Sequence, residues 1–205
     1  PYNDILSDLV RDPLMTPNQL ATKIVDKFAG WYDFWAMFDS KAELYTMVAV
    51  DLTKLKGTQN LIILLDDFAS KLKSKEAMYK EQIREAIASS ERFSGRCQID
   101  LYNFTSMVYS RVPDTEIRNA ALQIIASYPT SLLHWRHGSK HQYSYGLSIF
   151  LPKWTDPYWI DPYRHLYESS AFAADTQWDD FLKQFVSYGN LRVTISDISD
   201  GSPIG

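Results

Sequence analysis

Cys97 is the only thiol in the chain and is therefore the first residue to consider as a nucleophile. A reactive thiol needs a lowered pKa, which a neighbouring imidazole or a helix N-terminus provides, and it needs some exposure. Cys97 stands directly before the apolar start of a predicted helix at 98–101, and no motif pairs it with a histidine. We therefore predict a small, half-buried structural residue at the junction of a loop and a helix.

Three histidines, His134, His137 and His141, lie close together in the segment HWRHGSKH and are the chain's best metal-ligand candidates. Zinc ligands on a helix need histidines at positions i and i+4 of one face. His134 and His137 instead lie in a strand-like run, where an odd spacing directs them to opposite faces. Gly138 then interrupts the run, so the pattern favours the polar end of a hairpin over a metal site.

His165, Asp161 and Ser169 have the residue types of a hydrolase triad. The nucleophile of such an enzyme sits on a tight strand–turn–helix elbow, and no such pattern surrounds Ser169. Because triads are defined by geometry, a trio of these residue types alone carries little weight. We assign no triad.

Two acidic pairs, Asp66 with Asp67 and Asp179 with Asp180, lie in predicted helices. Two carboxylates can divide the work of acid and base, but adjacent helical residues point about 100° apart and do not face each other. We expect both pairs to lie on solvated helix faces.

Aromatic residues crowd one stretch of the chain, which contains Trp154, Tyr158, Trp159, Tyr163 and Tyr167. Exposed rings of this kind can stack on sugars or peptides. Large aromatic side chains more commonly pack under a long loop, and we predict that role here.

The overall composition limits the classes of function. The chain has 205 residues, of which 45% are hydrophobic, and a formal net charge of −4. An acidic balance argues against nucleic acid as the main partner, and no apolar run approaches the roughly 18 residues of a membrane span. The sequence begins at Pro1 without a Met or a leader, so we expect a processed chain or part of a longer one, with the relevant chemistry upstream.

Helices predominate over a few strands in the predicted elements. Thr16 and Gln19 form a capping box with Pro17 between them, which predicts a helix from there to about Phe38. The other predicted elements are a buried strand at 44–51, a long amphipathic helix, or two helices, at 61–87, a helix at 100–109, a helix after Asp114, a hairpin of strands 132–137 and 143–151, one helical turn at 163–168, a final helix from Thr176 and a last strand at 191–195.

Several stretches, in order, resemble the C-terminal portion of the clostripain-like cysteine peptidases. The opening segment has the pattern Tyr, Ile-Leu, Leu, Pro-x-Met-Thr-Pro-x-x-Leu, Ile-Val, and is similar to the segment just after that family's catalytic cysteine region. The further matching stretches are 45–52 followed by Lys54 and Leu55, the Asp-Leu-Tyr-x-Phe element in 99–104, the Gly-Leu-Ser-Ile strand ending in Pro in 145–152, and the closing pattern of Tyr167, Phe172 and 176–182.

This resemblance implies an α/β fold, namely the C-terminal part of a caspase/gingipain-like sheet flanked by helices, with an added helical region. It implies three regions: residues 1–56 complete the peptidase core, 57–130 form the helical region, and 131–205 form a sheet hairpin and a closing helix that pack on the core. Members of the family cut after Arg or Lys with a His-Cys dyad and an acidic pocket. Many are secreted bacterial enzymes that mature by self-cleavage, and some depend on calcium.

No position in this chain matches the family's dyad or its acidic pocket residue, so no catalytic, substrate-binding or metal-ligating residue is assigned. We expect the framework of a peptidase that is inactive alone, with no cofactor of its own, whose partners are the upstream chain of the same precursor and a peptide or protein substrate. The alternative is a non-catalytic binding or scaffold module derived from such a peptidase. In either case, strands that pair with upstream strands would leave apolar faces open in the isolated chain.

Overall fold

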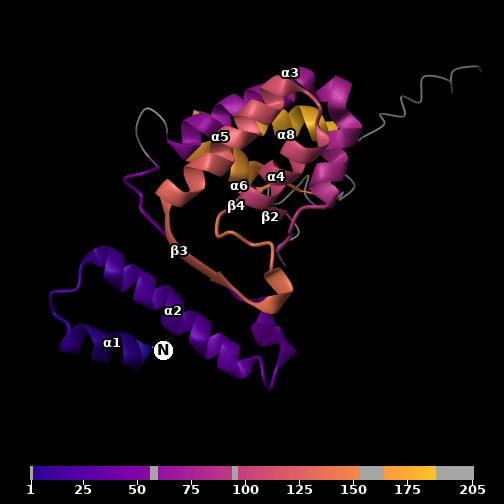
Figure 1. The fold of residues 1–205 in the computed structure, drawn as a ribbon. Helices are drawn as coiled ribbons and strands as arrows, with labels where there is room; N and C mark the ends of the chain where they lie inside the picture. Colours follow the sequence, from indigo (N-terminus) through magenta and orange to yellow (C-terminus); the bar gives the residue numbers. More distant parts are fainter. Residues whose placement is uncertain (1, 56–59, 94–96, 153–163, 188–205) are drawn as a thin grey trace, which may run out of the picture.

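The computed structural model describes residues 2–55, 60–93, 97–152 and 164–187, and forms a mixed α/β fold with two small antiparallel sheets. Figure 1 shows a helical body and, beside it, the layer of the first two helices, with strand β3 running between them. The mixed α/β class predicted from the sequence is confirmed. Every helix in these residues is too short or too polar to cross a membrane.

The first two helices are α1, Tyr2–Arg11, and α2, Pro17–Trp35. The predicted capping box is confirmed: the Gln19 N–H donates to Thr16 Oγ1 over 3.3 Å, and the Thr16 N–H donates to Gln19 Oε1 over 2.9 Å. None of the residues of α1 is buried. The outer helix therefore contributes little to the core of the described residues.

The first sheet joins the two parts of the molecule. A short helical turn, Ser40–Leu44, leads into β1, Thr46–Val50, which pairs antiparallel with β3, Leu132–His137. Val48 lies opposite Trp135, and the register shifts between Ala49 and Val50. The predicted region 1–56 is thus connected by a strand pair to the predicted region 131–205, and the three-region division itself stays a prediction.

Four helices build the body. They are α3, Leu61–Ala88, α4, Leu101–Arg111, α5, Thr115–Ser131, and α8, Trp178–Ser187. The backbone of α3 leaves helical geometry at Tyr79, so both sequence alternatives for this segment are partly right: the helix continues, but with a kink. The largest fully buried side chains of the core are Trp178, Phe68, Phe104, Phe181, Phe185 and Leu72.

The second sheet pairs β2, Gln98–Asp100, with β4, Ser148–Phe150, and Ile99 lies opposite Ile149. The predicted hairpin of 132–137 and 143–151 is therefore wrong, because each of its strands pairs with a different partner. A helical turn, Ser139–His141, replaces the tight turn, and Gly146, at φ 111°, redirects the chain toward β2. Two short helices follow, α6, Arg164–Glu168, and α7, Ala171–Asp175; the predicted strand at 191–195 lies outside the described residues.

Candidate functional site

The three clustered histidines do not converge on one point. His134 Nε2 lies 2.8 Å from Asp26 Oδ1, and His137 Nδ1 lies 3.1 Å from the carbonyl oxygen of the next residue. His141 is buried, and its Nδ1 lies 2.9 Å from Glu91 Oε1. Across the described parts of the chain, no group of three or more His, Cys, Asp or Glu side chains could hold a metal ion.

Cys97 is half-buried, as the sequence predicts, and packs against the hydrophobic core. The predicted loop-to-helix junction is wrong, because strand β2 directly follows Cys97 and the helix begins only at Leu101. Its carbonyl oxygen accepts a hydrogen bond from the Leu151 N–H over 2.7 Å, which extends the pairing of β2 with β4. Burial lowers the pKa of the neighbouring Arg92 guanidinium, and the charge of a Cys97 thiolate acts in the opposite direction. The backbone of Cys97 thus has a structural role in the second sheet.

The suggested triad cannot be assembled from the described residues. Asp161 and the side chain of His165 lie outside them. Ser169 Oγ donates to the Leu166 carbonyl oxygen over 2.9 Å, a contact within its own turn. Four of the five crowded aromatic residues, Trp154, Tyr158, Trp159 and Tyr163, also lie outside the described residues.

The carboxylates of the two acidic pairs form ion pairs with lysines, except for Asp66, which accepts a hydrogen bond at the start of a helix. Asp66 is half-buried, and its Oδ1 accepts a hydrogen bond from the Gln177 N–H over 2.7 Å, which caps the start of α8 from α3. The other three carboxylates each pair with a lysine, Asp67 with Lys71, Asp179 with Lys183 and Asp180 with Lys73. Hydrogen bonding to lysine lowers the pKa of Asp180. The expectation of plain solvated faces is therefore too simple for Asp66.

A buried carboxylate that sequence reasoning did not single out as a site, Asp100, lies where β2 meets α4. Its Oδ1 accepts from the Asn103 N–H over 2.8 Å and caps α4, and its Oδ2 accepts from the Tyr145 N–H over 2.7 Å. Burial raises the pKa of Asp100 to about 6, against the lowering effect of these hydrogen bonds. A carboxyl group that is held mainly by backbone amides in this way positions two segments of chain.

A carboxylate–imidazole pair lies beside it. The side chains of Glu91 and His141 are only 13% and 10% exposed. The Glu91 N–H donates to Asn103 Oδ1 over 2.8 Å, and the Glu91 carbonyl accepts from the Asp100 N–H over 2.9 Å. Such a pair can orient an imidazole for acid–base work, but here it joins the loop before β2 to the turn after β3. The two residues are 50 positions apart, so no sequence signal points to the pair.

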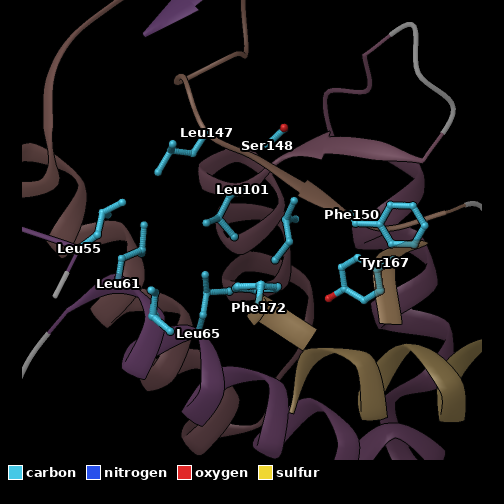
Figure 2. Close-up of a pocket in the computed structure, with 11 residues that line it drawn as sticks. Leu55, Leu61, Leu65, Leu101, Leu147, Ser148, Phe150, Tyr167 and Phe172 are labelled. Atoms are coloured by element: carbon cyan, nitrogen blue, oxygen red, sulfur yellow. The ribbon is translucent and has the colours of Figure 1, made fainter. Parts of the chain in front are cut away.

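The second feature with ligand-binding geometry is an apolar cavity of about 270 Å³ beside β4. Figure 2 shows side chains from the start of α3, from α4, from β4 and from the two short helices around it. The described lining residues are apolar apart from Ser148 and the hydroxyl of Tyr167. The Tyr167 ring stacks on Phe150 at 4.6 Å between centroids, which confirms the packing role predicted for this one aromatic residue.

Two arrangements therefore have the geometry of a site: the hydrogen-bonded network of Glu91, His141 and Asp100, and the apolar cavity with Tyr167. In the network, the polar groups hydrogen-bond to one another and hold separate segments of the chain together. The cavity has space and two polar side chains, those of Ser148 and Tyr167, and it is the better candidate for binding. No protein-family model, no curated protein and no solved structure matches the chain.

Proposed function

We propose that this chain is the C-terminal framework of a clostripain-like cysteine endopeptidase that cleaves after Arg or Lys, and that the His-Cys dyad lies on polypeptide upstream of residue 1. By the same resemblance, the parent is a secreted or cell-envelope bacterial enzyme that matures by self-cleavage. The chain supplies the rigid elements on which the reactive groups are held.

The observation that carries the proposal is that the stretches resembling the family bond to one another. The Tyr145 N–H of one stretch donates to the Asp100 carboxylate of another over 2.7 Å. The Trp178 Nε1–H of the closing stretch donates to the Phe150 carbonyl oxygen over 2.8 Å. These segments are far apart in sequence, and their mutual contacts support the interpretation that they belong to one structural core shared with the family.

The placement of the candidate nucleophile and bases also supports an upstream dyad. Thiolate attack needs a cysteine beside an imidazole and an oxyanion hole of backbone amides. The three histidines whose side chains are described bond to Asp26, to the Gly138 carbonyl and to Glu91. The backbone carbonyl of Cys97 extends the pairing of β2 with β4, and this structural role supports placing the dyad on upstream polypeptide.

The exposed apolar residues near the first two helices support the proposal that this part of the chain binds another polypeptide. The exposed large apolar residues of this part of the chain are Tyr2, Leu6, Val10, Leu14, Trp31, Phe34, Trp35, Met37 and Phe38. Trp31, Phe34, Trp35 and Phe38 contact one another at the end of α2, and exposed apolar clusters of this kind mark interaction sites. A two-stranded sheet such as β1 with β3 is also marginal alone and gains stability from further strands. The dyad-bearing polypeptide, with strands that extend this sheet, fits both features.

Some members of the family depend on calcium. Among the described residues, no group of three or more His, Cys, Asp or Glu side chains could hold a metal ion.

The test compares the isolated chain with the gene product in its natural length, both assayed on fluorogenic peptides that end in Arg or Lys. We expect hydrolysis only by the longer protein and unchanged hydrolysis by its Cys97→Ala variant. Activity of the isolated chain, or loss of activity on Cys97→Ala, contradicts the proposal.

The alternative, a non-catalytic binding or scaffold module, is favoured by the apolar cavity, which offers binding without catalysis. The two are separated by the sequence that precedes Pro1 in the gene product. A strand ending in His-Gly and an Asp-x-Cys segment support the peptidase, and their absence supports the module.

A further inference from the structure

The cavity beside β4 combines an apolar wall with one polar atom that has no partner. Its wall includes Leu61 and Leu65 of α3, Leu101 of α4 and Ile149 of β4. The hydroxyl of Tyr167 is buried and makes no hydrogen bond within the described residues. Figure 2 shows this hydroxyl turned toward Phe172, on the side of the cavity.

The direction of the Tyr167 hydroxyl is fixed by packing. Its ring stacks on Phe150, with an interplanar angle of 16°, and meets Phe172 edge-on at 6.5 Å between centroids. Burial raises the pKa of Tyr167, so the hydroxyl keeps its proton and is a hydrogen-bond donor. A buried donor without an acceptor is unfavourable, and a ligand that brings an acceptor removes that cost.

The size and charge of the cavity limit the ligand. A dry cavity of about 150 Å³ accepts benzene, so a volume of 270 Å³ corresponds to a molecule of about ten non-hydrogen atoms. Among the described residues that line the cavity, Tyr167 is the only ionisable one. An ionised ligand would lose its hydration without gaining a counter-charge, so the ligand must be neutral.

We propose that this cavity binds a small, uncharged, mainly apolar molecule whose carbonyl oxygen accepts a hydrogen bond from the Tyr167 hydroxyl. The walls supply affinity through burial of apolar surface, and the hydroxyl selects a ketone or ester over a hydrocarbon of the same shape. The inference is independent of the proposed peptidase role.

The test uses two probes of nearly the same shape, propiophenone, which has a carbonyl, and n-propylbenzene, which has none. Binding to the gene product in its natural length is measured by isothermal titration calorimetry. We expect propiophenone to bind about five- to tenfold more tightly than n-propylbenzene, the usual effect of one net hydrogen bond.

Three variants locate the site. Tyr167→Phe removes only the hydroxyl, and we expect it to abolish the preference for propiophenone while n-propylbenzene still binds. Ile62→Trp fills the cavity, because Ile62 lines it and is only partly buried, and we expect loss of both probes. Ile63→Trp, at the adjacent position, which is 48% exposed and outside the lining, is the matched control and should bind both probes normally.

Failure of both probes to bind the wild-type protein overturns the proposal, because the cavity then accepts no ligand of this chemical class. A preference for propiophenone that survives Tyr167→Phe, or equal binding by Ile62→Trp and Ile63→Trp, also overturns it.

Discussion

The carboxylate of Asp100 accepts a hydrogen bond from the backbone N–H of Tyr145, with 2.7 Å between Oδ2 and N. The other oxygen of the same carboxylate caps α4. One fully buried side chain thus fixes both the start of a core helix and the loop that enters β4. The backbone of a third segment is held here as well, since the Asp100 N–H itself donates to the Glu91 carbonyl.

The burial of Asp100 predicts a pH dependence of stability. Its pKa is raised from 3.8 to about 6 in the folded state, so between about pH 4 and 6 the folded protein binds more protons than the unfolded chain. The free energy of unfolding contributed by Asp100 therefore falls as pH rises through this window and is level above it. A shift of about two pH units corresponds to about 3 kcal/mol.

The measurement is urea denaturation of the wild type and Asp100→Asn at several pH values from 4 to 8. The stability difference, wild type minus variant, should fall across the window, because Asn does not titrate. Parallel pH profiles for the two proteins would show that Asp100 does not carry the effect.

Gly146 predicts a second, strongly local effect. Its φ of 111° is unfavourable for other residues, and an added Cβ would lie 2.8 Å from Val48 Cγ2. We expect Gly146→Ala to lower the free energy of unfolding by about 1–3 kcal/mol. Gly30→Ala is the matched control: it lies within α2, its Cβ would meet nothing within 4 Å, and removing a helical glycine adds about 0.5–1 kcal/mol. Thermal melting should show a lower melting temperature for Gly146→Ala and a higher one for Gly30→Ala. Equal changes in the two variants would contradict the argument from backbone conformation.

Local signals in the sequence predicted the helix starts well. Thr16 with Gln19, and Asp114, each cap a helix where the sequence places one, because capping needs only residues two or three positions apart. Strand pairing is different. Gly138 and its neighbours have the composition of a hairpin turn, yet β3 pairs with β1, a strand more than 80 residues earlier. No local pattern in the sequence predicts this pairing.

The candidate site was harder to predict than the fold, for the same reason. Cys97 was correctly placed as a half-buried residue, since its apolar neighbours indicate packing. The contact of His141 with Glu91, and that of Tyr145 with Asp100, join residues 50 and 45 positions apart. A single sequence carries no signal of such pairs, so the buried polar network appears only in the folded structure.

The unpartnered hydroxyl of Tyr167 predicts that its removal stabilises the ligand-free protein. The buried oxygen makes no hydrogen bond to the described residues, so Tyr167→Phe should raise the free energy of unfolding by about 1 kcal/mol. Tyr45→Phe is the control with the opposite sign, because the Tyr45 hydroxyl donates to Asp33 Oδ1 over 2.9 Å. Chemical denaturation measures both, and a destabilised Tyr167→Phe protein would mean that the hydroxyl has a partner in solution.

The apolar surface of the first two helices predicts self-association of the isolated chain. Val10 and Phe38 are 81% and 70% exposed, and water-exposed apolar patches drive association when their partner is absent. We expect Val10→Lys together with Phe38→Lys to weaken self-association about tenfold in sedimentation velocity, which corresponds to about 1.4 kcal/mol. Met78→Lys, a substitution at a 73% exposed site on α3, should leave it unchanged. A wild-type chain that sediments as a monomer, or an equal effect of Met78→Lys, would show that this surface does not drive self-association.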